Sequence, residues 1–230
     1  MNLLDLIFPK RCVGCGKIGN YFCHQCKMRI RPILQSETIC PVCEHPAMFG
    51  RTHPGCRTRF TVDGLTSFFH YDGVIKKAVK ALKYRFVSDV AAEFVSLIQE
   101  TSLSESLCLK LVHPIFSPIP LHKMRMHQRG FNQAEILGKL VADRLQIPIY
   151  TDILLRTRET KPQVEMKNKD DRLKNMHGVF ALNVKGKIDV RNKNVLLFDD
   201  VFTTGATMRA AAGVLKHSGA KRVWAVTMAR

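Results

Sequence analysis

After residue 60, the spacing of apolar and polar positions predicts a succession of strands and helices. In segment 73–84 the apolar residues recur at helical spacing with lysines on the opposite face, and segment 89–99 repeats the helical pattern. Shorter runs rich in β-branched and aromatic residues favour strands. Strands are expected at 65–71, 111–119, 179–182, 195–198 and 222–228, and further helices at 132–145 and 206–217. Because strands alternate with helices, the chain is predicted to form an α/β domain with a largely parallel sheet.

Two polar segments lie between these elements. Segment 120–130 is basic and is predicted to be a loop, and it leads to Asn132, which is placed to cap the helix 132–145. Segment 157–175 is long, charged and almost free of large apolar residues. Loops of that length inside a compact domain are usually functional or mobile.

Residues 1–60 carry most of the cysteines. Seven of the eight cysteines precede residue 57, and three pairs have the spacing Cys-x-x-Cys, whereas a fourth pair has histidine in its first position. Zinc binds four such ligands in a tetrahedron, and a Cys-x-x-Cys turn presents two thiolates on one side of the ion. Four pairs supply eight ligands, so we predict two zinc ions. The predicted ligands are Cys12, Cys15, Cys23, Cys26, Cys40, Cys43, His53 and Cys56.

The spacing leaves the grouping of these ligands open. Sequential pairing assigns the first four to one ion and the last four to the other, a cross-braced arrangement mixes them, and His24 and His45 are substitutes if His53 is not a ligand. A disulfide framework is the rival interpretation, but it requires export, and the N-terminus lacks a signal-peptide pattern. So small a unit depends on metal for its folding energy. We expect a structural or binding zinc domain at 1–60 and a second domain at 61–230.

The strand 195–198 leads into residues suited to a phosphorylated sugar. It is a continuous apolar run, as a central parallel strand should be, and Asp199 and Asp200 follow it directly. The loop 203–207 (Thr-Thr-Gly-Ala-Thr) then enters a helix, and helix N-termini at the carboxyl ends of parallel strands favour phosphate. Gly205 can adopt a positive φ that lets backbone N–H groups converge, and the threonine hydroxyls add donors. The paired carboxylates can accept hydrogen bonds from vicinal sugar hydroxyls or hold a metal ion.

Two other interpretations compete with this one. Acidic residues at the end of an apolar strand also hold Mg²⁺ in P-loop ATPases, but neither the phosphate-binding motif of those proteins nor the Gly-x-Gly-x-x-Gly motif of dinucleotide sites occurs. A purely structural pair of aspartates before a helix cap is the second alternative.

The charge of the chain points to anionic partners. Lysine and arginine total 36 against 19 acidic residues, which gives a formal net charge of +17 and a pI near 9.8. Such an excess favours phosphorylated small molecules, nucleic acid or an anionic membrane surface. No apolar run approaches the roughly 20 residues that cross a bilayer, so a cytoplasmic protein, peripheral to the inner membrane at most, is expected.

The segment 195–207 resembles the ribose-phosphate signature of type I phosphoribosyltransferases, and the rest of the chain resembles one branch of them, the ComF family of competence proteins. The pieces that carry this resemblance occur in the family's order over nearly the whole chain. Besides the zinc knuckles, they are the segments 82–85, 117–122, 129–134, 160–163, 172–175 with Phe180, and 227–230. One departure is His53, where the family usually has cysteine.

The resemblance implies a role for each of these positions. It implies a phosphoribosyltransferase-like parallel sheet flanked by helices behind a small zinc domain, and a site for 5-phosphoribosyl-1-pyrophosphate with Mg²⁺. Asp199 and Asp200 would accept the ribose hydroxyls, and Arg125 and Arg129 would face the pyrophosphate. The 5-phosphate would be held by Thr203, Thr204, Gly205, Ala206 and Thr207. The segment 157–175 would close over the reaction centre, with candidate residues Thr160, Gln163 and Arg172.

Three functions are compatible with the sequence. The first, which follows mainly from the resemblance, is a phosphoribosyl-pyrophosphate-binding factor for natural transformation that handles single-stranded DNA in the cytoplasm, with competence or recombination proteins as candidate partners. The second is an active phosphoribosyltransferase that displaces pyrophosphate, although no segment identifies its acceptor. The third is a ligand-regulated protein-interaction module in which the zinc ribbons dock a partner.

Overall fold

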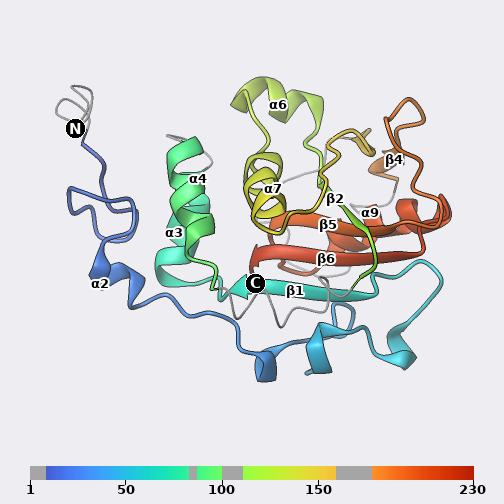
Figure 1. Ribbon diagram of the computed structural model, residues 1–230, viewed down its shortest axis with the longest axis horizontal. Coiled ribbons are helices and arrows are strands. Elements are labelled where there is room, and N and C mark those ends of the chain that lie inside the picture. Colours follow the sequence, from blue (N-terminus) through green and yellow to red (C-terminus); the bar gives the residue numbers. More distant parts are fainter. Residues whose placement is uncertain (1–8, 83–86, 100–110, 159–177) are drawn as a thin grey trace.

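The computed structural model of the protein describes residues 9–82, 87–99, 111–158 and 178–230 (Figure 1). The helices and strands are β1 (Gly64–Phe69), α3 (Gly73–Ala81), α4 (Val87–Ser96), β2 (Pro114–Pro118), α6 (Lys123–Arg129), α7 (Gln133–Arg144), β3 (Leu154–Arg156), β4 (Phe180–Leu182), β5 (Asn194–Val201), α9 (Ala206–His217) and β6 (Arg222–Ala229). The N-terminal segment contributes α2 (His24–Lys27) and the short 3₁₀ helices η1 (Gln35–Glu37), η2 (Met48–Gly50) and η3 (Pro54–Cys56).

Four parallel strands form the main sheet in the order β1-β6-β5-β2. In its centre β5 pairs with both neighbours, so that Leu197 stands opposite Ala225 on β6 and Ser117 on β2. The strands β3 and β4 form a separate antiparallel pair. The parallel sheet and the flanking helices confirm the predicted fold class.

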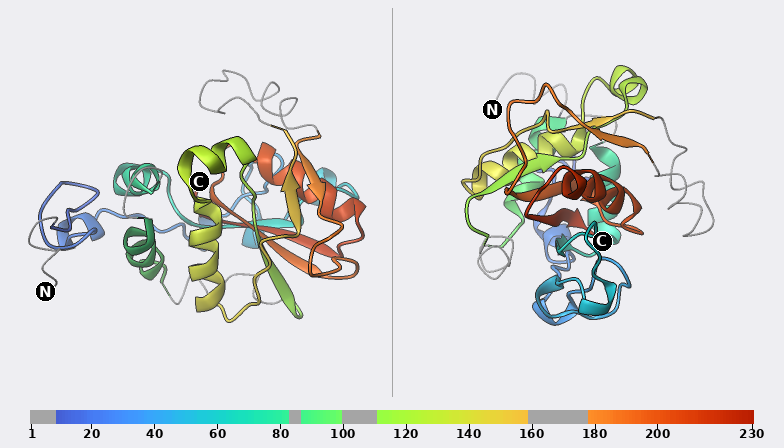
Figure 2. Two further views of the ribbon diagram at one scale, coloured as in Figure 1. Left: turned by 90° about the horizontal axis from the view of Figure 1, so that it is seen from above. Right: turned by 90° about the vertical axis from the view of Figure 1, so that its right-hand side faces the viewer.

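Successive residues of β5 point to opposite faces of the sheet and fill two cores. Leu196 and Phe198 belong to the core beneath α3, α4 and α7, whereas Val195 and Leu197 belong to the core beneath α9 and the β3–β4 pair. All four side chains are fully buried, and each contributes about 1.5–3 kcal/mol on this account. In Figure 2 (left), α7 and α9 accordingly lie on opposite sides of the sheet.

Most elements occur where the hydrophobic pattern predicts them. The bounds of α9 agree with the prediction, and Asn132 caps α7, because its side chain accepts a hydrogen bond from the Ala134 N–H at 3.1 Å. The prediction of a loop over 120–130 is wrong, since α6 begins there after His122, whose ring accepts from the Met124 N–H. The pattern failed because α6 has no buried residue and therefore no apolar stripe. It also failed to predict the three-residue strand β3.

The N-terminal segment runs along the edge of the sheet at β1. An antiparallel bridge joins Pro32 to Phe69, and another joins Arg51 to Gly64. A Cβ at Gly50 would overlap the Leu65 carbonyl, so the backbone at η2 packs directly on β1. Because edge strands expose unpaired backbone groups, this segment protects β1 from pairing with other chains. Within the segments that the structure describes, no helix is long and apolar enough to span a bilayer.

Candidate ligand-binding loop and metal centres

Asp199 and Asp200 lie near the carboxyl end of the central strand β5. Because β1, β6 and β2 are parallel to β5, their carboxyl ends lie at the same edge, which is where open α/β sheets bind ligands. On one side Asp199 stands opposite Thr227 of β6. On the other side, the Ile119 N–H just after β2 donates to the Phe198 carbonyl at 2.8 Å. The two carboxylates therefore lie between the ends of both neighbouring strands.

The carboxyl of Asp199 is a strong base for an aspartate. Burial, reinforced by the adjacent charge of Asp200, raises its pKa to about 8, although the Asp200 N–H donates to Asp199 Oδ1 at 2.9 Å and the positive charge of Arg156 opposes the shift. Burial and the charge of Asp200 also raise the pKa of Tyr71, which lies just beyond β1. A ligand or cation that brings positive charge or hydrogen-bond donors to this pair would relieve its repulsion.

The loop 203–207 forms the entry to α9. Gly205 is the N-cap residue and has a φ of 68°, which side-chain-bearing residues rarely adopt, and a Cβ there would lie 2.6 Å from the Phe202 ring. The loop thus turns sharply from the strand into the helix. The Thr204 hydroxyl oxygen is buried and has no hydrogen-bond partner among the described residues. A helix N-terminus with a buried hydroxyl beside it is suited to an anion.

Arg125 and Arg129 stand on α6, which follows β2 at the same edge of the sheet. Asn132 Nδ2 donates to the Ile119 carbonyl at 2.9 Å and so ties the end of α6 back to the end of β2. The Arg129 guanidinium donates to Gln133 Oε1 at 2.7 Å. Both arginines are partly buried rather than fully solvated. Their position next to the carboxyl end of β2 is compatible with the role predicted for them.

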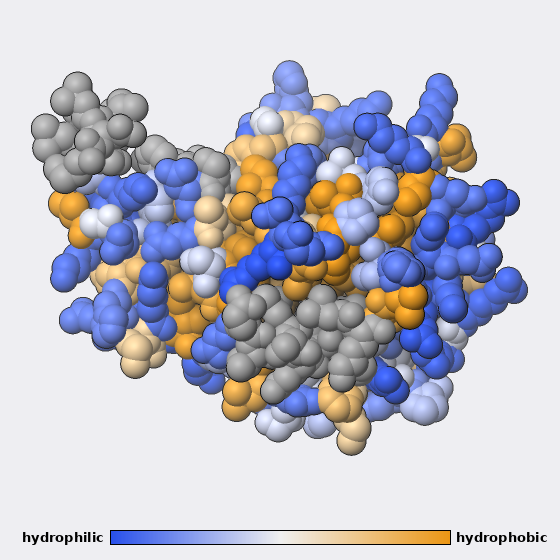
Figure 3. Space-filling view, viewed as in Figure 1, coloured by the Kyte–Doolittle hydropathy of each residue, from blue (hydrophilic) through white to orange (hydrophobic). Residues whose placement is uncertain are grey.

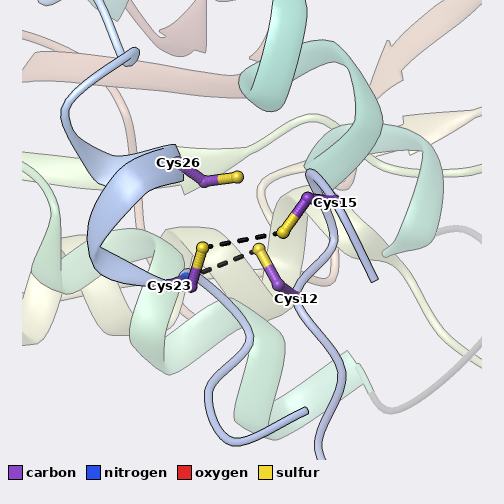
Figure 4. Close-up of side chains that lie close together, drawn as sticks. All are labelled: Cys12, Cys15, Cys23 and Cys26. Atoms are coloured by element: carbon purple, nitrogen blue, oxygen red, sulfur yellow. Dashed lines mark hydrogen bonds between the residues drawn. The ribbon is translucent and has the colours of Figure 1, made fainter. Parts of the chain in front are cut away.

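Cys12, Cys15, Cys23 and Cys26 converge at the first metal centre, where their sulfur atoms lie within 4.8 Å of one another (Figure 4). The Cys23 N–H donates to Cys12 Sγ at 3.4 Å, and Cys15 Sγ lies 3.6 Å from Cys23 Sγ. Although burial opposes it, backbone N–H groups lower the pKa of Cys12 to about 6, whereas burial and the neighbouring thiols raise that of Cys26 to about 12. A divalent cation bound among these sulfur atoms would favour the thiolate form of its ligands.

Cys40, Cys43, His53 and Cys56 form the second centre, again with all ligand atoms within 4.8 Å of one another. His53 Nδ1 lies 3.3 Å from Cys43 Sγ, while His53 Nε2 lies 3.0 Å from the Pro46 carbonyl oxygen. If Nε2 carries the proton and donates to that carbonyl, Nδ1 is free to bind a metal, because a hydrogen bond from the other ring nitrogen usually orients a ligating histidine. The two groups correspond to the sequential pairing, and neither His24 nor His45 belongs to them.

Comparison with known proteins agrees with both halves of this description. A family model described as Double zinc ribbon domain matches residues 3–57, and one described as Phosphoribosyl transferase domain matches residues 132–230. Competence protein F of Haemophilus influenzae is 27% identical over 231 residues, which are 97% of this chain and 98% of that protein. Competence protein ComFC of Bacillus subtilis is 29% identical over 86% of this chain and 78% of that protein. The chain thus combines a double zinc ribbon with a phosphoribosyl transferase domain and is similar to competence proteins over most of its length.

The chain is also similar to a protein named for DNA utilization and, more weakly, to two solved structures. The DNA utilization protein YhgH of Salmonella typhimurium is 29% identical over 86% of either chain. Among solved structures, the allosteric regulatory enzyme of purine biosynthesis gives a TM-score of 0.35 at 16% identity, covering 61% of this chain and 26% of that one. Hypoxanthine-guanine phosphoribosyl transferase of L. donovani gives a TM-score of 0.32 at 11% identity, covering 66% of this chain and 71% of that one. The fold assignment rests on the parallel sheet and the phosphoribosyl transferase match.

Two residues near the acidic pair were not predicted from the sequence. Arg156 is the last residue of β3, and its positive charge acts to lower the pKa of Asp199. Tyr71 follows β1, and the negative charge of Asp200 helps to raise its pKa. Tyr71 could have been found from its place at the end of a predicted strand, whereas no local signal distinguishes Arg156. The candidate residues Thr160, Gln163 and Arg172 lie outside the described residues. The described residues on either side of 159–177 contact each other, because the Thr157 N–H donates to the Val179 carbonyl at 2.8 Å.

Proposed function

We propose that the protein binds 5-phosphoribosyl-1-pyrophosphate with Mg²⁺ at the carboxyl edge of its sheet. The observation that carries this proposal is the continuity of Asp199 and Asp200 with a loop whose Gly205 has a positive φ at the start of α9. Two vicinal hydroxyls match two adjacent carboxylates, and a terminal phosphate matches the helix N-terminus. The residues proposed to hold the phosphate are Thr203, Thr204, Gly205, Ala206 and Thr207.

Electrostatics supports an anionic ligand accompanied by a cation. Asp199 and Asp200 repel each other, so a Mg²⁺ ion or hydroxyl donors stabilise the pair. Arg125 and Arg129 on α6 supply positive charge beside the same edge and are proposed to face the pyrophosphate. When bound, Mg²⁺ would neutralise pyrophosphate oxygens.

We further propose that the protein acts in DNA uptake or utilization, in the cytoplasm, and binds single-stranded DNA. Its relatives are named competence and DNA utilization proteins, and the net charge of +17 favours polyanions. Exposed cations gather in the two segments that lead into β5 and β6, at the amino-terminal edge of the sheet and opposite the edge with the acidic pair. They are Lys185, Lys187, Arg191, Lys193, Lys221 and Arg222. The two segments are adjacent, because the Lys221 N–H donates to the Lys193 carbonyl at 2.9 Å.

An exposed aromatic pair lies near these cations. The ring of Phe60, 38% exposed, stacks on His217 with centroids 3.5 Å apart, at the end of α9 and close to the start of β6. Lysines that follow a phosphate backbone together with an aromatic ring form the usual surface for single strands. In Figure 3 hydrophilic side chains dominate the right-hand flank of the face, and hydrophobic ones gather near its centre.

The zinc ribbons at 1–60 are proposed to be structural and to provide a docking surface for competence or recombination proteins. In both centres all four ligand positions come from the protein, which leaves no open position for catalysis. The cysteine groups are joined to the sheet domain by packing and hydrogen bonds, so the proposed boundary near residue 60 separates two units that are in contact.

Calorimetric titration with phosphoribosyl pyrophosphate and Mg²⁺ tests the ligand. We expect saturable binding by the wild-type protein and a loss of at least about tenfold in affinity for Asp200→Asn. Asp189→Asn is the matched control, because Asp189 is exposed and paired with Arg191 away from the loop. Equal affinity of the wild-type and Asp200→Asn proteins would show that the acidic pair is wrongly assigned. Release of pyrophosphate with a base or amine added would instead indicate an active transferase.

Filter binding of a labelled single strand over a salt series tests the DNA proposal. We expect affinity to fall steeply with salt, and the slope to decrease for Lys193→Glu combined with Lys221→Glu. Phe60→Ala should weaken binding without changing the slope, because stacking releases no counterions. Absence of binding at low ionic strength would exclude direct handling of DNA.

A further inference from the structure

Arg209 connects the second metal centre to the proposed phosphate loop. It lies in the first turn of α9, where its N–H donates to the Gly205 carbonyl at 2.8 Å. Its guanidinium donates through Nη2 to the Thr204 carbonyl at 2.6 Å and through Nη1 to the Pro41 carbonyl at 3.0 Å. Pro41 lies inside the zinc knuckle 40–43. One side chain therefore hydrogen-bonds to two separate segments: Pro41 is 168 positions away in the sequence, and Thr204 is 5 positions away.

The bond to Thr204 fixes the orientation of one peptide group in the loop. The Thr204 carbonyl and the Gly205 N–H belong to the same trans peptide, so they point in opposite directions. When Arg209 holds the carbonyl on its own side, the Gly205 N–H is directed to the other side. Rotation of this peptide would exchange a donor for an acceptor in a loop proposed to bind phosphate.

The Arg209 guanidinium needs both of its acceptors. Burial lowers its pKa, and the nearby carboxylate of Glu44, which follows the knuckle, counteracts this. An arginine stays charged at neutral pH even so, and a partly buried cation is costly unless it is hydrogen-bonded. Loss of the Pro41 carbonyl would therefore favour other positions of the guanidinium, and the Thr204 carbonyl would lose its donor.

A metal ion bound at the second centre would hold the Pro41 carbonyl in place. Cys40 and Cys43 flank it, and the His53 N–H donates to Cys40 Sγ at 3.5 Å. The rest of this centre is anchored to the sheet independently, since the Thr52 N–H donates to the Asp63 carbonyl at 3.0 Å. Without metal a small zinc unit loses most of its folding energy, so the knuckle would lose its fixed shape.

The first metal centre is attached to a different part of the protein. Glu93 of α4 accepts hydrogen bonds from the Tyr21 and Phe22 N–H groups, both at 3.1 Å, and Lys77 of α3 donates to the Gly14 carbonyl at 2.6 Å. The helices α3 and α4 cover one face of the sheet, whereas α9 covers the opposite face. The two centres therefore offer a comparison within one molecule.

We propose that the second zinc centre is a positioning element of the phosphate loop and that Arg209 transmits its state to the Thr204–Gly205 peptide. Zinc occupancy at Cys40, Cys43, His53 and Cys56 thereby sets the affinity of the loop for a phosphorylated ligand. The proposal rests on the loop being the site described under the proposed function. Zinc loss from the first centre leaves the loop unchanged.

Calorimetric titration with phosphoribosyl pyrophosphate and Mg²⁺ tests this proposal in a double-mutant cycle. We expect Arg209→Met and His53→Ala each to weaken binding roughly tenfold, and the double variant to be no weaker than either, because both remove the same connection. Arg209→Lys should restore part of the affinity. Cys15→Ser, which removes a ligand of the first centre, should leave affinity within about twofold of the wild-type value.

Hydrogen exchange of the peptide that covers 199–209 provides a readout that needs no ligand. Exchange should accelerate in Arg209→Met and His53→Ala and stay at the wild-type rate in Cys15→Ser. Additive losses of affinity, or unchanged exchange in a folded Arg209→Met protein, would overturn the proposal. If the wild-type protein fails to bind the ligand, the proposed function is wrong, and the exchange data alone then decide whether the connection exists.

Discussion

Lys216 Nζ lies 2.6 Å from Asp63 Oδ2, and each side chain is only 11% exposed. The same carboxylate oxygen accepts a hydrogen bond from the Val223 N–H at 2.8 Å. The pair thus joins the segment that leaves the zinc ribbons to α9 and to β6. We expect Asp63→Ala to lower the free energy of unfolding by about 3 kcal/mol, because it leaves the Lys216 charge buried without its partner. Urea denaturation measures this.

The control for this prediction is the exposed pair of Lys139 and Glu135 on α7, whose nitrogen and oxygen atoms lie at a similar distance, 2.7 Å, but whose lysine is 56% exposed. Glu135→Gln should change the free energy of unfolding by less than about 0.5 kcal/mol. Similar effects of the two substitutions would show that burial does not determine the contribution of the Asp63 pair.

Asp199→Asn should stabilise the protein increasingly as the pH rises. The folded-state pKa of Asp199 is about 8, above that of an aspartate in an unfolded chain. Between these two pKa values the folded state binds a proton that the unfolded state does not, so the wild-type protein loses stability as the pH rises toward 8. The variant lacks this loss. We expect its advantage in free energy of unfolding to grow by about 2–3 kcal/mol between about pH 6 and 8.5. Urea titrations at both pH values measure the difference, and a constant difference would contradict the raised pKa.

Gly205→Ala should damage the loop. The φ of 68° and the Phe202 ring both oppose a side chain at this position, so we expect a loss of stability of about 1–3 kcal/mol and weaker ligand binding. Gly213→Ala is the matched control within the same helix, because a Cβ there meets no atom within 4 Å. It should stabilise the protein by about 0.5–1 kcal/mol. Thermal denaturation compares the two, and equal effects would argue against a strained turn at Gly205.

Purified protein should contain two zinc ions per chain, one for each group of ligands. His53→Ala should reduce the content to one, His53→Cys should keep two because a thiolate can replace the imidazole, and His45→Ala should keep two because His45 belongs to neither group. Plasma emission spectroscopy measures the stoichiometry. One zinc ion in the wild-type protein would mean that one of the two groups does not bind metal.

The sequence predicts the parts of this molecule that depend on local patterns. The bounds of α9 follow from helical spacing, and the central position of β5 follows from its continuous apolar run. Cysteine spacing predicts the ligands, but the grouping needs the folded chain. Segment 120–130 was misassigned because α6 buries no residue and so lacks periodicity. The connection of Arg209 to Pro41 joins residues 168 positions apart, and no local pattern predicts it.

A crystal structure of the protein with phosphoribosyl pyrophosphate and Mg²⁺ tests the central claim most directly. The 5-phosphate should lie against the backbone N–H groups of 204–207, with both ribose hydroxyls within hydrogen-bond distance of Asp199 and Asp200. The pyrophosphate should lie on the side of Arg125 and Arg129. A ligand bound elsewhere at full occupancy, or a loop without bound ligand at a saturating concentration, would contradict it.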